Sequence, residues 1–253
     1  MVIFGAGNVA THLSRHFFSR GCNIEAIYSR TLDRAEELAA GVGAAATNRL
    51  EEIPALADIY LVCLPDSEVA PISEKLPDHR GIWVHTAGAL PIGIFQPVHT
   101  DCGVLYPLQS LSRERQISLE EVPLLVEGSS AEVTRVLKDL ASSISERVYE
   151  ADSASRLLFH LAAVFANNFS NHMVHIAGQI LSREGEDVRL LVPLLRETFL
   201  KLEEMDPYDA QTGPAARGDA ATMEKHLELL GKYPEWKKLY TFISRDIGRS
   251  RNK

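Results

Sequence analysis

Short apolar runs alternate with amphipathic stretches through the first 150 residues. The runs over 2–4, 24–28, 59–64 and 81–86 are rich in β-branched or aromatic residues, which is typical of strands buried on both faces of a parallel sheet. Helical stretches over 9–20, 32–40 and 67–76 separate them, and further strands are predicted over 103–106, 122–128 and 147–151, with a helix over 131–144. This alternation predicts right-handed crossover units and an α/β fold with a doubly wound parallel sheet.

The pattern changes near Asp152. The segment 153–185 is predicted as one long helix that is apolar on most faces, as in a helix buried within its domain or against a partner. Helices follow over 187–205, 221–231 and 234–249, and the composition of 206–219 indicates a long loop. We therefore predict an α/β domain over residues 1–150 and an all-helical domain over residues 151–253.

A glycine turn follows the first strand and opens the first helix. Gly5, Gly7 and Ala10 form a G-x-G-x-x-A pattern, which allows a tight turn, close approach of a pyrophosphate and close packing of helix on strand. Free N–H groups at the helix N-terminus favour phosphate binding. The context predicts a dinucleotide site rather than a purely structural turn. Its expected contacts are Gly5, Ala6, Gly7, Asn8, Val9 and Ala10.

The end of the second strand indicates which cofactor binds. NAD-binding chains usually carry an acid about 20 residues past the glycines, to hold the ribose hydroxyls. Here the strand ends in Ser29, Arg30 and Thr31, with no acid. Arg30 can pair with a 2′-phosphate and the two hydroxyls can donate to it, which predicts NADP(H). The alternative is that Arg30 only caps a surface turn.

Two more strand ends are expected beside the cofactor, because ligands of open α/β sheets bind beyond the carboxyl ends of the strands. Asp66 also fits the N-cap of the next helix. His85 fits either a proton donor near the nicotinamide or a structural histidine. The cofactor contacts predicted here are Leu64, Pro65, Asp66, Thr86, Ala87 and Gly88.

Several motifs together resemble a known family. These motifs are GAGNVATHL, YSRT, CLPD, HTAGALP, YPLQS, HLAAVFANNFSNH and QTGPAARGD. With them the chain resembles the Rossmann-like proteins with a helical DUF2520 domain, which are described as NADP oxidoreductases. The layout is more distantly similar to pyrroline-5-carboxylate reductase and the 6-phosphogluconate dehydrogenase superfamily. The resemblance implies a helical domain of the 6-phosphogluconate dehydrogenase C-terminal type, which forms a homodimer and completes the active site. The dehydrogenase branch of that superfamily carries a catalytic Lys, followed one turn later by Asn, on its long interdomain helix. The corresponding helix predicted here over 153–185 has no lysine, so the lysine-based mechanism of that branch does not transfer.

Polar residues follow one side of the long helix at positions 160, 167, 168, 171 and 175. Buried amide and imidazole groups need partners, since each unsatisfied one costs on the order of 1–3 kcal/mol. One interpretation places His160 and Asn168 against the nicotinamide and substrate, with His160 or His85 as the proton donor that hydride transfer needs. The other is a polar seam that fixes helix register or a dimer interface.

The loop over 211–219 supplies a second candidate. Arg217 follows two alanines and precedes Gly218, so its guanidinium can bind a carboxylate or phosphate, or else form a surface ion pair. Asp219 fits the N-cap of the next helix.

Composition limits the class of protein. A net charge of −8 disfavours non-specific nucleic-acid binding, and no apolar run is long enough to cross a bilayer. The three cysteines form no CxxC pair, and no signal peptide is expected, which together favour a reducing cytoplasm. No metal site is expected.

The leading interpretation is an NADP(H)-dependent oxidoreductase that acts on a C=O or C=N bond of a small anionic molecule. A non-catalytic NADP(H) sensor or scaffold, and a deazaflavin-dependent reductase, remain alternatives.

Overall fold

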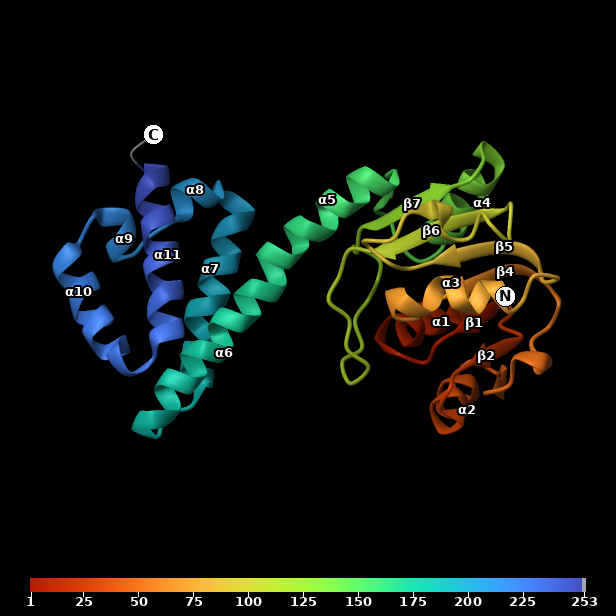
Figure 1. The fold of residues 1–253 in the computed structure, drawn as a ribbon, viewed down its shortest axis with the longest axis horizontal. Coiled ribbons are helices and arrows are strands. Elements are labelled where there is room, and N and C mark those ends of the chain that lie inside the picture. Colours follow the sequence, from red (N-terminus) through yellow and green to blue (C-terminus); the bar gives the residue numbers. More distant parts are fainter. Residues whose placement is uncertain (252–253) are drawn as a thin grey trace. The chain divides into compact units, whose positions relative to one another are not determined.

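The computed structural model describes residues 1–251, in two compact units, residues 1–173 and residues from 174 onward (Figure 1). The division falls within helix α6 (Ser170–Leu181), so the preceding helix α5 (Ser153–Ala163) belongs with the sheet. The domain boundary expected after residue 150 stays a prediction, and residues 252–253 of the expected helical domain lie outside the described residues. None of the described helices is long and apolar enough to span a membrane.

The first unit contains an eight-stranded sheet in the order β3-β2-β1-β4-β5-β6-β7-β8, and all neighbours are parallel except β6 and β7. Its strands are β1 (Val2–Phe4), β2 (Ala26–Tyr28), β3 (Ala45–Thr47), β4 (Leu56–Val62), β5 (Arg80–His85), β6 (Cys102–Pro107), β7 (Leu124–Gly128) and β8 (Val148–Glu150). This confirms the predicted doubly wound α/β fold. Strand β3 escaped prediction because its three residues are two alanines and a threonine, which give no apolar run.

The register of the sheet gathers strand ends at one edge. Phe4 at the end of β1 lies beside both Tyr28 and Val62, and Val62 lies beside His85. His85 in turn lies beside Val104 of β6. Since β2, β1, β4, β5 and β6 are parallel neighbours, their carboxyl ends meet along this edge, where open α/β sheets bind ligands.

Helices cover both faces of the sheet. Helices α1 (Asn8–Ser19), α2 (Leu32–Ala40) and α4 (Ala131–Ser142) bury their apolar sides in one core cluster. Helix α3 (Asp66–Glu74) packs in the other, with the short turns η1 (Leu50–Glu52) and η2 (Ile92–Ile94). The prediction that Asp66 is the N-cap of α3 is wrong. Pro65 takes the cap position, since its extended backbone places Asp66 as the first helical residue, where the carboxylate still favours the helix dipole.

The long helix predicted over 153–185 is helical throughout, but it is interrupted by a π-turn, η3 (Val164–Phe169), between α5 and α6, and it ends in η4 (Ser182–Glu184). Such π-turns are frequent at functional sites. The second unit continues with η5 (Val188–Leu191), α7 (Val192–Glu204), α8 (Pro207–Ala210), α9 (Pro214–Arg217), α10 (Ala220–Leu229), η6 (Leu230–Lys232) and α11 (Pro234–Arg251). The segment predicted as a loop thus contains two single-turn helices, and Asp219 caps α10 as expected.

One buried guanidinium attaches α5 to the sheet. The Arg156 side chain is 1% exposed and forms an ion pair with Glu127 of β7. It also donates to the carbonyl oxygen of Leu90, in the segment after β5. Ser153 completes the network, since its hydroxyl donates to Glu127 (2.9 Å) and accepts from the Ile92 N–H (3.0 Å). Helix α5, strand β7 and the segment after β5 are therefore joined by one polar network.

Breaking this pair should destabilise the protein strongly. The substitution R156M leaves the partly buried Glu127 carboxylate without its partner, and we expect a loss of about 3 kcal/mol in the free energy of unfolding, the lower end of the range for buried pairs. The double variant R156M/E127L should lose less, because no charge is left uncompensated. Urea unfolding monitored by circular dichroism measures both values. R135M on the exposed face of α4 is the control, and equal losses in all three variants would contradict the assignment.

Candidate active site

The glycine turn has the geometry that dinucleotide binding needs. Gly5 has φ +109°, and a Cβ there would collide with the carbonyl oxygen of Cys63. Gly7 is the N-cap of α1, with open space where a side chain would stand. Ala10 is fully buried, so α1 packs closely on the sheet. The first N–H groups of α1 are therefore accessible to a phosphate, as residues 5–10 predict.

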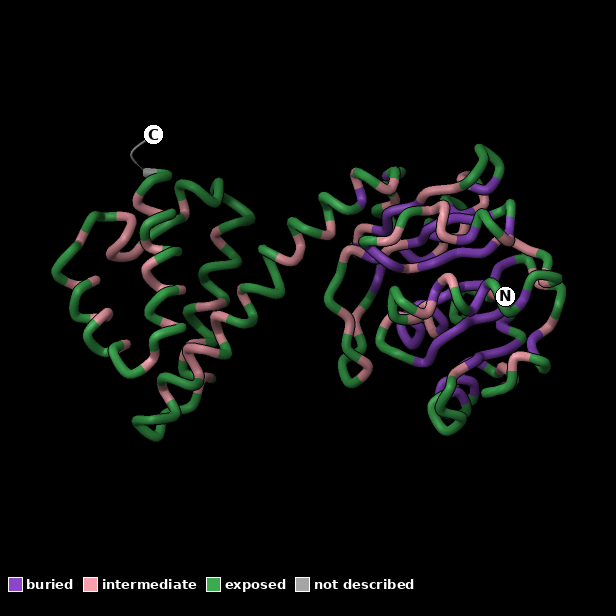
Figure 2. Tube along the Cα trace, viewed as in Figure 1, coloured by how far each residue is buried: buried purple, intermediate pink, exposed green. Residues whose placement is uncertain are grey.

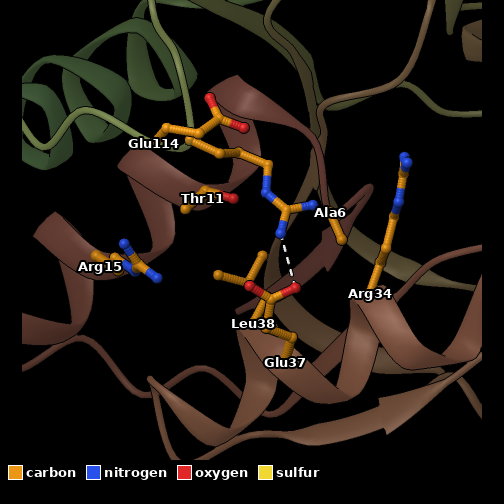
Figure 3. Close-up of a pocket in the computed structure, with 8 residues that line it drawn as sticks. Ala6, Thr11, Arg15, Arg34, Glu37, Leu38 and Glu114 are labelled. Carbon is orange, nitrogen blue, oxygen red and sulfur yellow. Dashed lines mark hydrogen bonds and ion pairs between the residues drawn. The ribbon is translucent and has the colours of Figure 1, made fainter.

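The predicted 2′-phosphate residues follow β2 at the same edge. Thr31 is the N-cap of α2, and its N–H donates to the Ser29 hydroxyl (3.3 Å). The Arg30 guanidinium lies 3.1 Å from Glu68 of α3, and both side chains are largely exposed. Arg34, in the first turn of α2, lines a cavity with Ala6 of the glycine turn (Figure 3). Sequence reasoning missed Arg34, although an arginine one turn beyond Arg30 at a helix start was a usable signal.

His85 has the environment of a structural residue. Its side chain is completely buried at the end of β5, and Nδ1 accepts a hydrogen bond from the Ala87 N–H (3.2 Å). Burial, together with the positive charge of Arg156, lowers the pKa of His85 to about 3. The ring is therefore neutral and fixes the turn over Thr86 and Ala87. Of the two roles left open for His85, this burial favours the structural one, and the role as a proton donor stays a prediction.

His160 instead forms a pair with Tyr106. The Tyr106 oxygen lies 3.0 Å from His160 Nδ1, and the two rings meet edge to face. Tyr106 stands two residues beyond Val104 in β6, so it lies at the carboxyl edge beside the end of β5. A Cβ on Gly88 would come within 2.7 Å of the His160 ring, so the imidazole packs directly on the backbone after β5. His160 thus lies where the nicotinamide is expected.

The hydrogen bond between the two rings fixes the orientation of the imidazole. Burial raises the pKa of Tyr106, so the phenol keeps its proton. The bond engages Nδ1 of His160 and leaves Nε2 on the other side of the ring. Sequence reasoning missed Tyr106, because a tyrosine at the end of an apolar strand resembles a core residue.

The remaining predicted residues are placed as follows. Leu64, Pro65 and Asp66 follow β4 at the same edge. Asn168 lies in the π-helical segment η3, and Asn167, Asn168 and Asn171 are exposed in this chain, so both the site role and the polar seam at a dimer interface stay predictions. Arg217, in the second unit, is exposed at the end of α9 between Gly213 and Gly218, both with positive φ. The roles of Asn168 and Arg217 stay predictions.

Comparisons with known proteins agree with the fold and the glycine turn. Residues 1–84 match the family described as NADP oxidoreductase, coenzyme F420-dependent, and residues 122–247 match the domain of unknown function DUF2520. A Bacteroides fragilis protein described as a putative NADP oxidoreductase is 39% identical, with 98% of this chain and 97% of that chain covered and a TM-score of 0.94. Protein TM1727 from Thermotoga maritima is 25% identical, with 100% and 99% covered and a TM-score of 0.74. No curated protein matches the sequence.

More distant structures share the fold. A reductive aminase from Aspergillus terreus, in complex with NADPH and ethyl-5-oxohexanoate, is 16% identical, with 98% of this chain and 90% of that chain covered and a TM-score of 0.65. The fold and the glycine turn define a Rossmann-type, NADP-dependent oxidoreductase. The chain belongs to the family of NADP oxidoreductases that carry a DUF2520 domain.

The neutral state of His85 makes the fold sensitive to acid. Its folded pKa lies below the value of about 6.5 in an unfolded chain, so the unfolded state binds more protons between about pH 6.5 and about pH 3. Stability should fall as the pH drops through this window. H85N keeps an acceptor for Ala87 but does not titrate, so it should lose less stability between about pH 7 and about pH 4.5. Urea titrations at both pH values measure the difference, with H172N as an exposed control. An unchanged pH dependence in H85N would refute the assignment.

Proposed function

We propose that this protein reduces a C=O or C=N bond in a small anionic substrate with NADPH, and that His160 donates the proton. The observation that carries the proposal is the Tyr106–His160 hydrogen bond beside Gly88, at the edge that also holds the glycine turn. Bound NADPH supplies the hydride in such a reaction, while the protein supplies position and a proton.

Each part of the site has a separate task. The glycine turn and the start of α1 bind the pyrophosphate, and Ser29, Arg30 and Thr31 bind the 2′-phosphate. Tyr106 holds the His160 ring through Nδ1, so that Nε2 can face the substrate. When both of its ring nitrogens carry hydrogen, His160 passes the Nε2 proton to the substrate oxygen or nitrogen as negative charge develops there; it is left as the neutral imidazole and recovers a proton from water afterwards. Asn168, in the same unit as His160, is our candidate for holding the substrate, and Arg217, in the second unit, stays a separate candidate for binding an anionic group.

Turnover tests the proposal. We expect NADPH oxidation, followed by its absorbance, with a panel of small oxo acids and cyclic imino acids. H160N should lower kcat by about 10²- to 10⁴-fold with unchanged NADPH affinity, because it removes the proton donor only. Y106F should give a smaller loss, because the imidazole remains but its ring is no longer held in position by the Tyr106 hydroxyl.

Two outcomes would count against this function. Turnover that survives H160N would reject His160 as the donor. Tight NADPH binding without turnover on any oxo or imino acid would favour the alternative, a non-catalytic NADP(H) sensor.

We also propose a homodimer formed through the helical unit. After Arg156 no described residue is buried (Figure 2), although this part of the chain is rich in large apolar side chains. Leu194 of α7 is 63% exposed and Phe242 of α11 is 73% exposed. Exposed apolar surface on this scale marks an association site, and a helical unit without a core of its own needs one. A second copy carries the same surface, so a symmetric dimer buries it on both sides.

A charge placed on this surface should dissociate the dimer. F242E and L194E each put a carboxylate into the proposed interface, so we expect wild-type protein to sediment as a dimer and both variants to shift toward monomer at micromolar concentration. Analytical ultracentrifugation measures this. K237E, on an exposed position of α11, is the matched control. A monomeric wild-type protein would contradict the proposal.

A further inference from the structure

The loop that joins β6 to β7 is fastened across the cofactor-binding edge. It leaves the carboxyl end of β6 and reaches α1, where His12 Nε2 lies 2.9 Å from the carbonyl oxygen of Ser112. The next residue, Arg113, donates its backbone N–H to the Asn8 side-chain oxygen (3.3 Å), and Asn8 is part of the glycine turn and helix start. The loop therefore positions Arg113 directly beside the predicted pyrophosphate site.

The Arg113 side chain lines a cavity of about 190 Å³ with Ala6, Arg15, Arg34, Glu37 and Glu114. Figure 3 shows Arg15 and Arg34 on opposite sides of this cavity, and its dashed line is the Arg113–Glu37 ion pair, 2.7 Å long. The Arg113 side chain is 27% exposed and Glu37 is 62% exposed. Within residues 1–251, Arg15 and Arg34 form no ion pair of their own. Arginines thus outnumber glutamates around this cavity, which Ala6 of the glycine turn also lines.

Location and charge together point to a phosphate. Arg34 stands in the first turn of α2, three residues after Thr31, and α2 directs its free N–H groups to the same edge. A ligand with a carboxylate would bind Arg113 no better than Glu37 does, because both groups carry one negative charge. A dianionic phosphate, in contrast, pairs with two arginines at once and accepts bidentate hydrogen bonds. An exposed ion pair such as Arg113–Glu37 is weak, so its exchange for a phosphate is favourable.

We infer that Arg113, with Arg34, completes the 2′-phosphate site of NADP(H) from the β6–β7 loop, and that Glu37 holds Arg113 until the cofactor arrives. The inference rests on the proposed NADPH-dependent function. It makes Arg113 a determinant of the preference for NADPH over NADH, supplied from a segment about 80 residues beyond Arg30 in the sequence. It also explains why the loop is anchored to Asn8 and His12, since these contacts hold the guanidinium at the phosphate.

Calorimetric titration with four probes tests the inference: NADPH, NADH, adenosine 2′,5′-bisphosphate and AMP. R113Q should weaken binding of the two 2′-phosphorylated probes by about 10- to 100-fold and leave NADH and AMP unchanged. E37Q should strengthen NADPH binding several-fold, because Arg113 no longer has a competing partner. R30Q is the reference for loss of a 2′-phosphate contact, and R115Q, on the same loop and exposed, is the matched control.

The outcomes separate the two proposals. Equal losses for NADPH and NADH in R113Q would show that the loop only supports the glycine turn, and would overturn the inference. No change in R113Q together with no change in E37Q would overturn it as well. Wild-type protein that binds neither dinucleotide would reject the proposed function itself.

Discussion

The buried ion pair between Arg156 and Glu127 is the contact on which the site depends. A buried pair adds little net stability, but its geometry is demanding, so it specifies one arrangement of the groups it joins. Arg156 lies one helical turn before His160, and it also holds the carbonyl of Leu90, two residues past Gly88. The same guanidinium therefore fixes where His160 meets the sheet edge, and its charge helps to keep His85 neutral.

Two histidines at one sheet edge have different surroundings. His85 follows β5 in the strand register and is closed off from solvent, so desolvation removes its charged form. His160 approaches the same backbone from a helix and is only partly buried, with a tyrosine on one nitrogen and the other left for a ligand. In the proposed reaction, the strand end holds the backbone of the site in place, and the helix supplies His160 as the proton donor.

Local patterns predicted the fold and the NADP(H) cofactor. Apolar runs located most strands, and the glycine turn and Arg30 are contiguous motifs whose chemistry is local. Tyr106 and Arg113 could not be predicted in this way, because their roles depend on the pairing of β6 with β5 and on the path of a polar loop. Arg156 was hidden in an apolar helix for the same reason, since its partner is 29 residues away in the sequence.

An acidic protein that binds a highly anionic cofactor faces an electrostatic conflict, since its net charge of −8 repels the ligand at long range. The structure resolves it locally by pairing Arg30 with Glu68 and Arg113 with Glu37, each acid lying on a helix beside the site. These pairs hold the guanidinium groups at the sheet edge. Each pair includes an exposed glutamate, so water and salt weaken it, and in our proposal a phosphate dianion displaces the carboxylates. Specificity for the 2′-phosphate would follow from this exchange, since a ribose hydroxyl has no charge with which to release either arginine from its glutamate.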